Sequence, residues 1–124
     1  NITNAYTRLF TPYRDKGLVN FFHVPDYIQI NHHAFWVTFD TTQHQQDFMA
    51  KLREFKVSAY IGYVALHSAP KGLEYGYTPE SLPITQDIAS RVVRLPFYTE
   101  LGTQPSLDYC IDAMRRVLEE IYPS

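Results

Sequence analysis

Apolar side chains recur every three to four residues in three parts of the chain, a period that predicts helices. The first helix is predicted over residues 5–13 and ends at Lys16–Gly17. The second begins with a capping-box pattern of Thr42 and Gln45. The last begins at Ser106, which we expect to cap it. Its broad apolar stripe consists of Leu107, Cys110, Ile111, Met114, Val117, Leu118 and Ile121.

Other segments show the composition or the two-residue period of strands. Residues 34–40 carry bulky side chains on both faces, which predicts a strand in the centre of its sheet. Residues 57–66 are rich in Val, Ile, Tyr and Ala and predict a second strand. Residues 19–30 contain Pro25 and predict an irregular extended segment or a short edge strand. The expected core unit is therefore a strand, a helix and a second strand.

Proline and glycine punctuate the second half of the chain. They cluster in residues 68–83, which predicts a long surface loop. After this loop, Thr85 is expected to cap a helix whose inward face includes Ile88 and Val92. Because Pro96 prevents that helix from continuing, its exit is expected at Arg94–Leu95–Pro96.

These elements predict a two-layer α/β (α+β) fold, in which helices pack on one face of a small mixed or antiparallel sheet. The length of 124 residues fits one domain of this kind. The expected core consists of Phe35, Val37, Phe39, Phe48, Leu52, Ile88, Val92, Ile111, Met114 and Leu118.

Composition narrows the classes of function. With 45% hydrophobic residues, ten Tyr and eight Phe, the chain favours an ordered domain with much aromatic surface to cover. The net charge is −2 and Lys and Arg are scattered, so nucleic-acid binding is not expected. No apolar run approaches the roughly 20 residues of a membrane span. The single cysteine, Cys110, cannot form an internal disulfide and fits a reducing compartment, so a cytoplasmic location is expected.

The residues that could carry chemistry form no recognisable catalytic motif. Five histidines invite a metal site, but His32 and His33 are adjacent at the start of a strand, where successive side chains point to opposite faces. A metal site is therefore not expected. Cys110 lies on the apolar stripe of the last helix, so we interpret it as a core residue rather than a nucleophile. The sequence also lacks a Gly-rich phosphate loop and a nucleophile elbow.

Three segments match a known family as strings of residues. Asn31–Val37 resembles an Asn-x-His-x-Phe-aromatic-aliphatic segment. Ile61–Gly72 is similar to a Phe-His-Tyr-x-Pro-Leu-His stretch followed by a Pro-x-Gly turn. Ser90–Tyr98 is similar to a Ser-x-Arg-x-x-Arg-Leu-Pro run. In this order and at these separations, and over nearly the whole chain, they resemble the DegT/DnrJ/EryC1/StrS family of nucleotide-sugar aminotransferases.

The resemblance implies that residues 1–124 are the C-terminal small domain of a fold-type I, aspartate aminotransferase-like enzyme that uses pyridoxal phosphate (PLP). In that family a separate large domain carries the lysine that binds PLP. We therefore expect no catalytic residue and no bound cofactor in this chain. Because Asn1 is not an initiator methionine, we expect the chain to be a piece of a longer protein.

The resemblance is nearest to enzymes that transfer an amino group from glutamate to C4 of a dTDP-4-keto-6-deoxyhexose. Their products include dTDP-4-amino-4,6-dideoxygalactose, used for bacterial surface polysaccharides such as lipopolysaccharide, O-antigen and enterobacterial common antigen. Such enzymes are usually homodimers, so the resemblance implies a homodimer, a nucleotide-sugar substrate and glutamate as partners of the intact protein.

The same resemblance implies four substrate-binding residues. Asn31, His33 and Tyr63 correspond to positions near the active-site mouth, and His67 begins the segment that follows. On general grounds, His33 fits a histidine satisfied by nearby backbone equally well, and Tyr63 fits a packed core aromatic.

The chain departs from the family pattern at two positions. Gly62 stands where the family has histidine, and Ala65 stands where it has proline. A glycine opens space in place of a side chain, so residue 62 is not expected to contact substrate and the exact sugar stays open.

A hypothesis from another class is a free-standing binding or regulatory module that uses the same aromatic surface for a protein or sugar partner. A reading frame that extends upstream of Asn1 would favour the aminotransferase, whereas a start codon close to Asn1 would favour the module. A plain α/β domain without a ligand is a third interpretation, and the three ordered matches argue against it.

Overall fold

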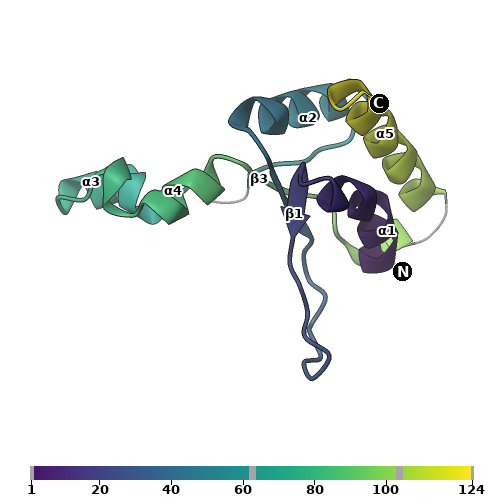
Figure 1. The fold of residues 1–124 in the computed structure, drawn as a ribbon, viewed down its shortest axis with the longest axis horizontal. Helices are drawn as coiled ribbons and strands as arrows, with labels where there is room; N and C mark the ends of the chain where they lie inside the picture. Colours follow the sequence, from purple (N-terminus) through teal and green to yellow (C-terminus); the bar gives the residue numbers. More distant parts are fainter. Residues whose placement is uncertain (1, 62–63, 103–104, 124) are drawn as a thin grey trace.

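The fold is that of a computed structural model, which describes residues 2–61, 64–102 and 105–123. Its three strands form one antiparallel sheet in the order β1–β2–β3, and its three longest helices pack beside that sheet (Figure 1). The strands are β1 (Val19–Phe21), β2 (Trp36–Phe39) and β3 (Val92–Arg94), and these helices are α1 (Ile2–Asp15), α2 (Thr42–Glu54) and α5 (Ser106–Ile121). This architecture confirms the expected two-layer combination of helices and a small antiparallel sheet.

Strand β2 lies in the centre of the sheet, as its bulky side chains predict. Val37 pairs with Phe21 of β1 on one side and with Val93 of β3 on the other, so these three side chains share one face. All three are buried, whereas Trp36, on the opposite face, is 37% exposed. One face of the sheet is therefore fully covered and the other is partly covered, since Thr38 on that second face is only 6% exposed.

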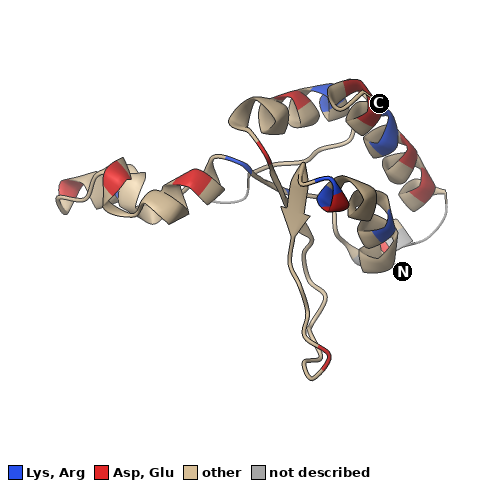
Figure 2. Ribbon diagram, viewed as in Figure 1, with Lys and Arg blue, Asp and Glu red and all other residues tan. Residues whose placement is uncertain are grey.

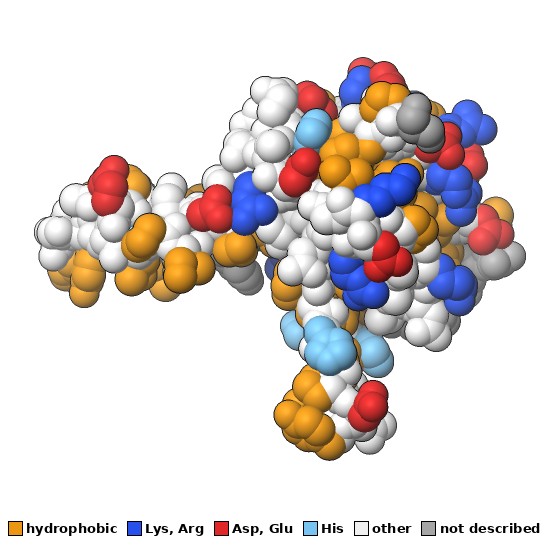
Figure 3. Space-filling model, viewed as in Figure 1, with side chains coloured by type: hydrophobic (Ala, Val, Ile, Leu, Met, Phe, Trp, Pro, Cys, Tyr) orange, Lys and Arg blue, Asp and Glu red, His pale blue; other side chains and the backbone are white. Residues whose placement is uncertain are grey.

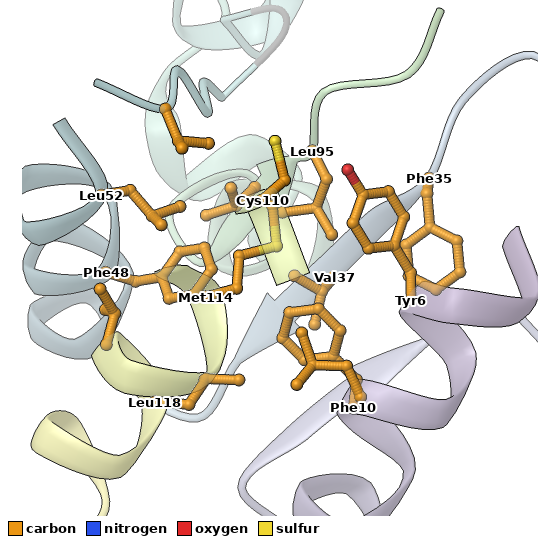
Figure 4. Close-up of a cluster of buried hydrophobic side chains, with 14 of the residues drawn as sticks. Tyr6, Phe10, Phe35, Val37, Phe48, Leu52, Leu95, Cys110, Met114 and Leu118 are labelled. Carbon is orange, nitrogen blue, oxygen red and sulfur yellow. The ribbon is translucent and has the colours of Figure 1, made fainter. Parts of the chain in front are cut away.

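The three long helices pack their apolar faces onto the covered face of the sheet. In the close-up of the core, side chains from α1, α2 and α5 surround Val37 (Figure 4). The Phe48 ring of α2 lies 4.8 Å from the Phe39 ring and 6.2 Å from the Phe10 ring. Cys110 is buried on α5 as a free thiol, which confirms its place on the apolar stripe.

Seven of the ten expected core residues are fully buried, and three are not. The seven are Phe35, Val37, Phe39, Phe48, Leu52, Met114 and Leu118. Ile88 is 40% exposed because its helix projects away from the core, and Val92 is only half-buried because it lies on the face of β3 opposite to the buried Val93. Ile111 lies at the edge of the core and is half-buried.

The expected second strand over residues 57–66 is wrong for its described residues. Tyr60 makes only an isolated antiparallel bridge with Arg94, with backbone hydrogen bonds of 3.2 Å and 2.7 Å. The helix that was expected to include Val92 and to exit at Arg94–Leu95–Pro96 ends at Ala89, and residues 92–94 instead form β3 and complete the sheet. The core unit is therefore an antiparallel sheet of three strands that are distant in sequence, rather than a strand, a helix and a second strand.

Two helix caps also differ from expectation. Thr41, not Thr42, caps α2, and its side chain accepts a hydrogen bond from the His44 N–H at 3.1 Å. Gln45 is buried and its amide donates to the Val92 carbonyl at 2.9 Å, which ties α2 to β3 in place of a capping box. Helix α5 begins at Ser106 without a side-chain cap, because Pro105 occupies the cap position.

Two segments leave the compact core as projecting arms (Figure 1). We call residues 22–35, which join β1 to β2, the hairpin arm, and residues 66–90 the helical arm. The helical arm consists of η1 (Leu66–Ser68), α3 (Pro70–Glu74), η2 (Pro79–Ser81) and α4 (Pro83–Ala89), where η denotes a 3-10 helix. A further short helix, η3 (Thr99–Gly102), precedes α5. The expected surface loop over residues 68–83 is thus a run of short helices, and α4 begins at Pro83 rather than after a Thr85 cap.

A polar cluster around Asp40 fixes the C-terminal end of α5. The Tyr122 hydroxyl donates to Asp40 Oδ1 at 2.6 Å, and His44 Nδ1 lies 2.7 Å from the same oxygen. Burial opposes ionisation of Asp40, but the hydrogen bonds with Tyr122 and His44 outweigh it and lower the pKa of the carboxyl. The ionised carboxylate therefore links the start of α2 to the end of the chain.

Phe48→Ala tests the central packing. Removing a fully buried ring between two other rings should lower the free energy of unfolding by about 3–5 kcal/mol. Urea denaturation measures this change. Tyr27→Ala is the matched control, because Tyr27 is 87% exposed and its loss should change stability by less than about 0.5 kcal/mol. Equal effects of the two substitutions would contradict this packing.

Tyr122→Phe tests the Asp40 cluster. The folded state lowers the pKa of Asp40 below its ordinary value of 3.8, so the stability it contributes is complete above that value and is lost as pH falls through the folded pKa. We expect the variant to be less stable by about 1 kcal/mol at neutral pH, and the difference to be smaller at a pH well below 3.8. Urea denaturation at both pH values measures this. A difference that is independent of pH would contradict the role of the carboxylate.

Candidate functional site

The site residues implied by the sequence lie on the two arms and not in the compact core. Asn31 and His33 are exposed on the hairpin arm, where pale-blue histidines gather between the core and the apolar tip (Figure 3). His67 lies on the helical arm. Tyr63, the fourth residue, is outside the described residues, as is Gly62. The described candidate residues therefore lie on two separate arms, and we call the open angle between these arms the corner (Figure 1).

His33 is held by its own loop and keeps one ring nitrogen available. Its Nδ1 lies 3.2 Å from the Asn31 carbonyl oxygen. A carbonyl can only accept, so Nδ1 carries the proton in this hydrogen bond, and in the neutral ring Nε2 is then an acceptor. The exposed ring can therefore receive a hydrogen bond from a ligand hydroxyl.

His32 belongs to a different contact. Its Nδ1 lies 3.3 Å from the Thr3 hydroxyl, which ties the hairpin arm to α1. The two neighbouring histidines thus face different partners, as expected for successive residues in extended chain. Among the described residues, no group of three or more His, Cys, Asp and Glu side chains is placed to hold a metal ion.

His67 is buried inside the helical arm and connects two of its short helices. It is 5% exposed, and its Nε2 lies 3.2 Å from the Pro79 carbonyl oxygen, which joins η1 to η2. Its Nδ1 is also buried and has no hydrogen-bond partner among the described residues. In this position the imidazole orients the arm from within.

Gly72 allows the same part of the arm to pack closely. A side chain at residue 72 would overlap the Leu66 carbonyl oxygen and would lie 2.8 Å from the His67 carbonyl oxygen. Only glycine therefore lets α3 approach η1 so closely. Beside this contact is a hollow of about 550 Å³. It is lined by Leu66, His67, Ala69, Lys71, Gly72, Tyr75, Tyr77 and Leu82.

Arg91 clamps the helical arm to the sheet. Its guanidinium donates to both carboxylate oxygens of Asp87, at 3.1 Å and 2.7 Å, and to the Phe39 carbonyl at 2.6 Å. The hydrogen bond with Arg91 lowers the pKa of Asp87 and raises that of the guanidinium. One side chain thus joins the end of α4 to the end of β2. The sequence analysis missed this clamp, although the four-residue spacing of Asp87 and Arg91 is a signal for it once a helix is assumed.

A second cation lies at the root of the helical arm. The Arg94 guanidinium is 5.9 Å from the centre of the Tyr60 ring, and Tyr60 is 53% exposed. Tyr60 is the last residue that pairs with the sheet before the helical arm begins. The contact therefore places the positive charge of Arg94 at the base of that arm.

A family model for the DegT/DnrJ/EryC1/StrS aminotransferase family matches residues 1–115 of this chain. The chain belongs to that family. No curated protein sequence matches it. The family resemblance of the three sequence segments is thereby confirmed.

Solved structures of three proteins share the fold. Spr1654 from Streptococcus pneumoniae, described as a sugar aminotransferase, superposes in its PMP form with a TM-score of 0.81 at 16% identity, over 97% of this chain and 30% of that chain. The aminotransferase TlmJ from Streptoalloteichus hindustanus gives 0.75 at 17% identity, over 97% and 31%. A DegT DnrJ EryC1 StrS aminotransferase from Brucella abortus gives 0.63 at 21% identity, over 91% and 30%. The chain thus spans about 30% of the length of these proteins.

The four lysines of this chain lie in settings unlike that of a lysine that binds PLP. A lysine that binds PLP is normally held where desolvation or a neighbouring charge lowers its pKa. Lys16, Lys56 and Lys71 are exposed, and Lys51 forms an ion pair with Glu120 at 2.6 Å. None of the four lysines is therefore placed for that chemistry.

No helix built from the described residues has the length and apolar character needed to cross a bilayer.

Gly72→Ala tests whether the close contact of α3 with η1 holds the arm together. The new methyl group would meet backbone oxygens that cannot move independently, so we expect a loss of about 1–3 kcal/mol that is confined to the arm. Amide hydrogen exchange should accelerate in residues 66–82 and stay unchanged in α5. Lys71→Ala is the control, since Lys71 makes exposed contacts that contribute little, an ion pair with Glu74 and a contact 5.5 Å from the centre of the Tyr75 ring. Unchanged exchange in the glycine variant would show that the arm can adapt.

Proposed function

We propose that this chain is the C-terminal small domain of a PLP-dependent sugar aminotransferase, and that the catalytic large domain lies in the remainder of a longer protein. The observation that carries the proposal is the family match over residues 1–115. The fold shared with Spr1654 over 97% of this chain supports it, because there the same unit is about 30% of a longer chain. PLP, when bound to the large domain, supplies the carrier of the amino group.

The role of this domain in that enzyme is to cover the cofactor cleft and to orient the nucleotide sugar. Both arms project from the core and leave a corner between them, which is the shape expected of a rim around a cleft. The core holds the arms in place through the paired strands and through the clamp of Arg91 on Asp87 and Phe39. Such positioning lowers the barrier by fixing the reactants and does not require a catalytic residue here.

The proposed reaction transfers an amino group from glutamate to C4 of a dTDP-4-keto-6-deoxyhexose, for a bacterial surface polysaccharide. The resemblance of segments Asn31–Val37, Ile61–Gly72 and Ser90–Tyr98 supports this choice of sugar. We further propose a homodimer in the cytoplasm. The family assignment favours the dimer, and the single buried thiol of Cys110 fits a reducing compartment.

Four residues have proposed roles toward the nucleotide sugar. His33 accepts a hydrogen bond from a sugar hydroxyl at Nε2, or donates one to a phosphate when the ring is protonated, since the ring is exposed and anchored to the Asn31 carbonyl. Asn31 presents an exposed amide from the same turn. Tyr63 contributes its phenol from the segment that leads into the helical arm. His67 is a positioning residue that acts through the shape of that arm, because its ring is buried against Pro79.

A second candidate function is a free-standing binding module. The observation in its favour is the number of large apolar side chains exposed on the arms, which a protein or sugar partner could cover. A longer encoded protein with a PLP-binding lysine would exclude it.

The deciding experiment uses the full-length gene product, purified with PLP. It is mixed with dTDP-4-keto-6-deoxyglucose and glutamate, and the formation of 2-oxoglutarate is measured. We expect turnover by the full-length protein and none by residues 1–124 alone. If the longest encoded chain shows neither cofactor absorbance nor turnover, the aminotransferase proposal fails and the binding module stands.

His33→Ala tests the proposed contact with the sugar. Loss of one hydrogen bond to bound substrate should raise KM for the nucleotide sugar about tenfold, with KM for glutamate unchanged. His32→Ala is the matched control, because His32 is the neighbouring imidazole but contacts Thr3. Steady-state kinetics of the full-length variants measure both constants. Equal effects of the two substitutions would remove His33 from the substrate site.

A further inference from the structure

The helical arm carries an apolar edge that the described residues of this chain leave exposed. Every residue of α4 and of η2 retains solvent exposure above the level of the core. Seven large apolar side chains of the arm are between 40% and 84% exposed. We call them the apolar edge: Leu66, Leu73, Tyr75, Tyr77, Leu82, Ile84 and Ile88. A single soluble domain rarely exposes so many contiguous apolar side chains without a partner.

The apolar side chains and the charges lie on opposite sides of the arm. In the space-filling view the apolar side chains follow its lower border, and acidic side chains lie above them (Figure 3). The acidic residues of the arm are Glu74, Glu80 and Asp87 (Figure 2). Two of them are paired, Glu74 with Lys71 and Asp87 with Arg91. The polar side is thus suited to water, and the apolar edge is suited to a protein surface.

The apolar edge faces the same corner as the tip of the hairpin arm. In Figure 3 the apolar surface of that tip lies on the side toward the helical arm. Its exposed apolar residues are Tyr27, at 87%, and Ile28, at 46%. One convex body seated in the corner would cover both surfaces at once.

We propose that the apolar edge is the docking surface for the large domain of the same polypeptide. This inference rests on the proposed function, in which residues 1–124 are one domain of a longer aminotransferase. The solved relatives support the choice of occupant, because the unit that matches this chain is only about 30% of each of them. The hydrogen bonds of Arg91 with the Phe39 carbonyl and of His67 with the Pro79 carbonyl hold the apolar edge in a fixed shape before docking. A surface that is already ordered loses less conformational entropy when it binds.

The test compares one pair of substitutions in two proteins. Ile84→Asp with Ile88→Asp places two charges on the apolar edge, and Thr85→Asp places one charge on the same helix, at an exposed polar position that is not part of the apolar edge, as the matched control. Residues 1–124 alone and the full-length protein each carry these changes. The readouts are amide hydrogen exchange over residues 66–90 and the melting temperature.

In the wild-type full-length protein we expect exchange over residues 66–90 to be at least about tenfold slower than in residues 1–124 alone. The double substitution should remove that protection and lower the melting temperature of the full-length protein. It should leave residues 1–124 unchanged, because both side chains are exposed there. Thr85→Asp should be neutral in both proteins. If the double variant does not fold, Ile88→Ser replaces it, and the wild-type comparison stands by itself.

Three results would overturn the proposal. The first is equal exchange of residues 66–90 in the two wild-type proteins, and the second is a neutral double substitution in both. The third is protection that fades on dilution of the full-length protein, which would assign the edge to a second copy. Turnover by a full-length protein whose arm is unprotected would refute the docking surface alone. A protected arm in a protein without turnover would refute the aminotransferase function and keep the interface.

Discussion

Antiparallel hydrogen bonding on both sides of β2 is the interaction on which the rest of this structure depends. The three strands have only three or four residues each, so they are stable only because helices cover their buried face. Since these strands are distant in sequence, their pairing brings together α1, α2 and α5. The same pairing forces residues 22–35 and 66–90 outward, because no place remains for them beside the small core. Most of the exposed large apolar side chains therefore lie on the arms, and the others are Trp36, Tyr60, Ile61, Val64, Tyr98 and Tyr109.

Elements in which many apolar side chains recur with one regular spacing are predicted correctly from the sequence. The apolar stripe of α5 and the alternation in β2 are such elements. Short elements, which contain too few residues to show a spacing, are misplaced. Strand β3 has three residues and directly follows α4, so Val92 fits the inward face of a helix as well as a strand. Prolines 70, 79 and 83 predict a loop when they are counted as breakers. Each instead stands at the first turn of a short helix, where its missing N–H leaves no hydrogen bond unmade.

The candidate site can be predicted from the sequence only in the segments whose residues match those of the family in order. The segment around Asn31 and His33 marks the hairpin arm, and the structure leaves both side chains exposed there. No pattern in the sequence indicates that His67 is buried, because its partner Pro79 is twelve residues away in a segment without an apolar period. The Arg91 clamp is hidden for a similar reason, since the Phe39 carbonyl lies 52 residues away. Long-range contacts of single side chains leave little trace in one sequence.

The two ends of each arm are paired with each other, so one arm can be replaced by another segment without a change in the core. Phe21 pairs with Val37 at the base of the hairpin arm, and Tyr60 meets Arg94 at the base of the helical arm. A segment whose two ends are joined in this way can change its length or composition at little cost to the rest of the molecule. Relatives that share this frame at 16% identity can therefore differ most in the arms. Grafting one arm between two such proteins is then a way to transfer the rim of one cleft onto the scaffold of another.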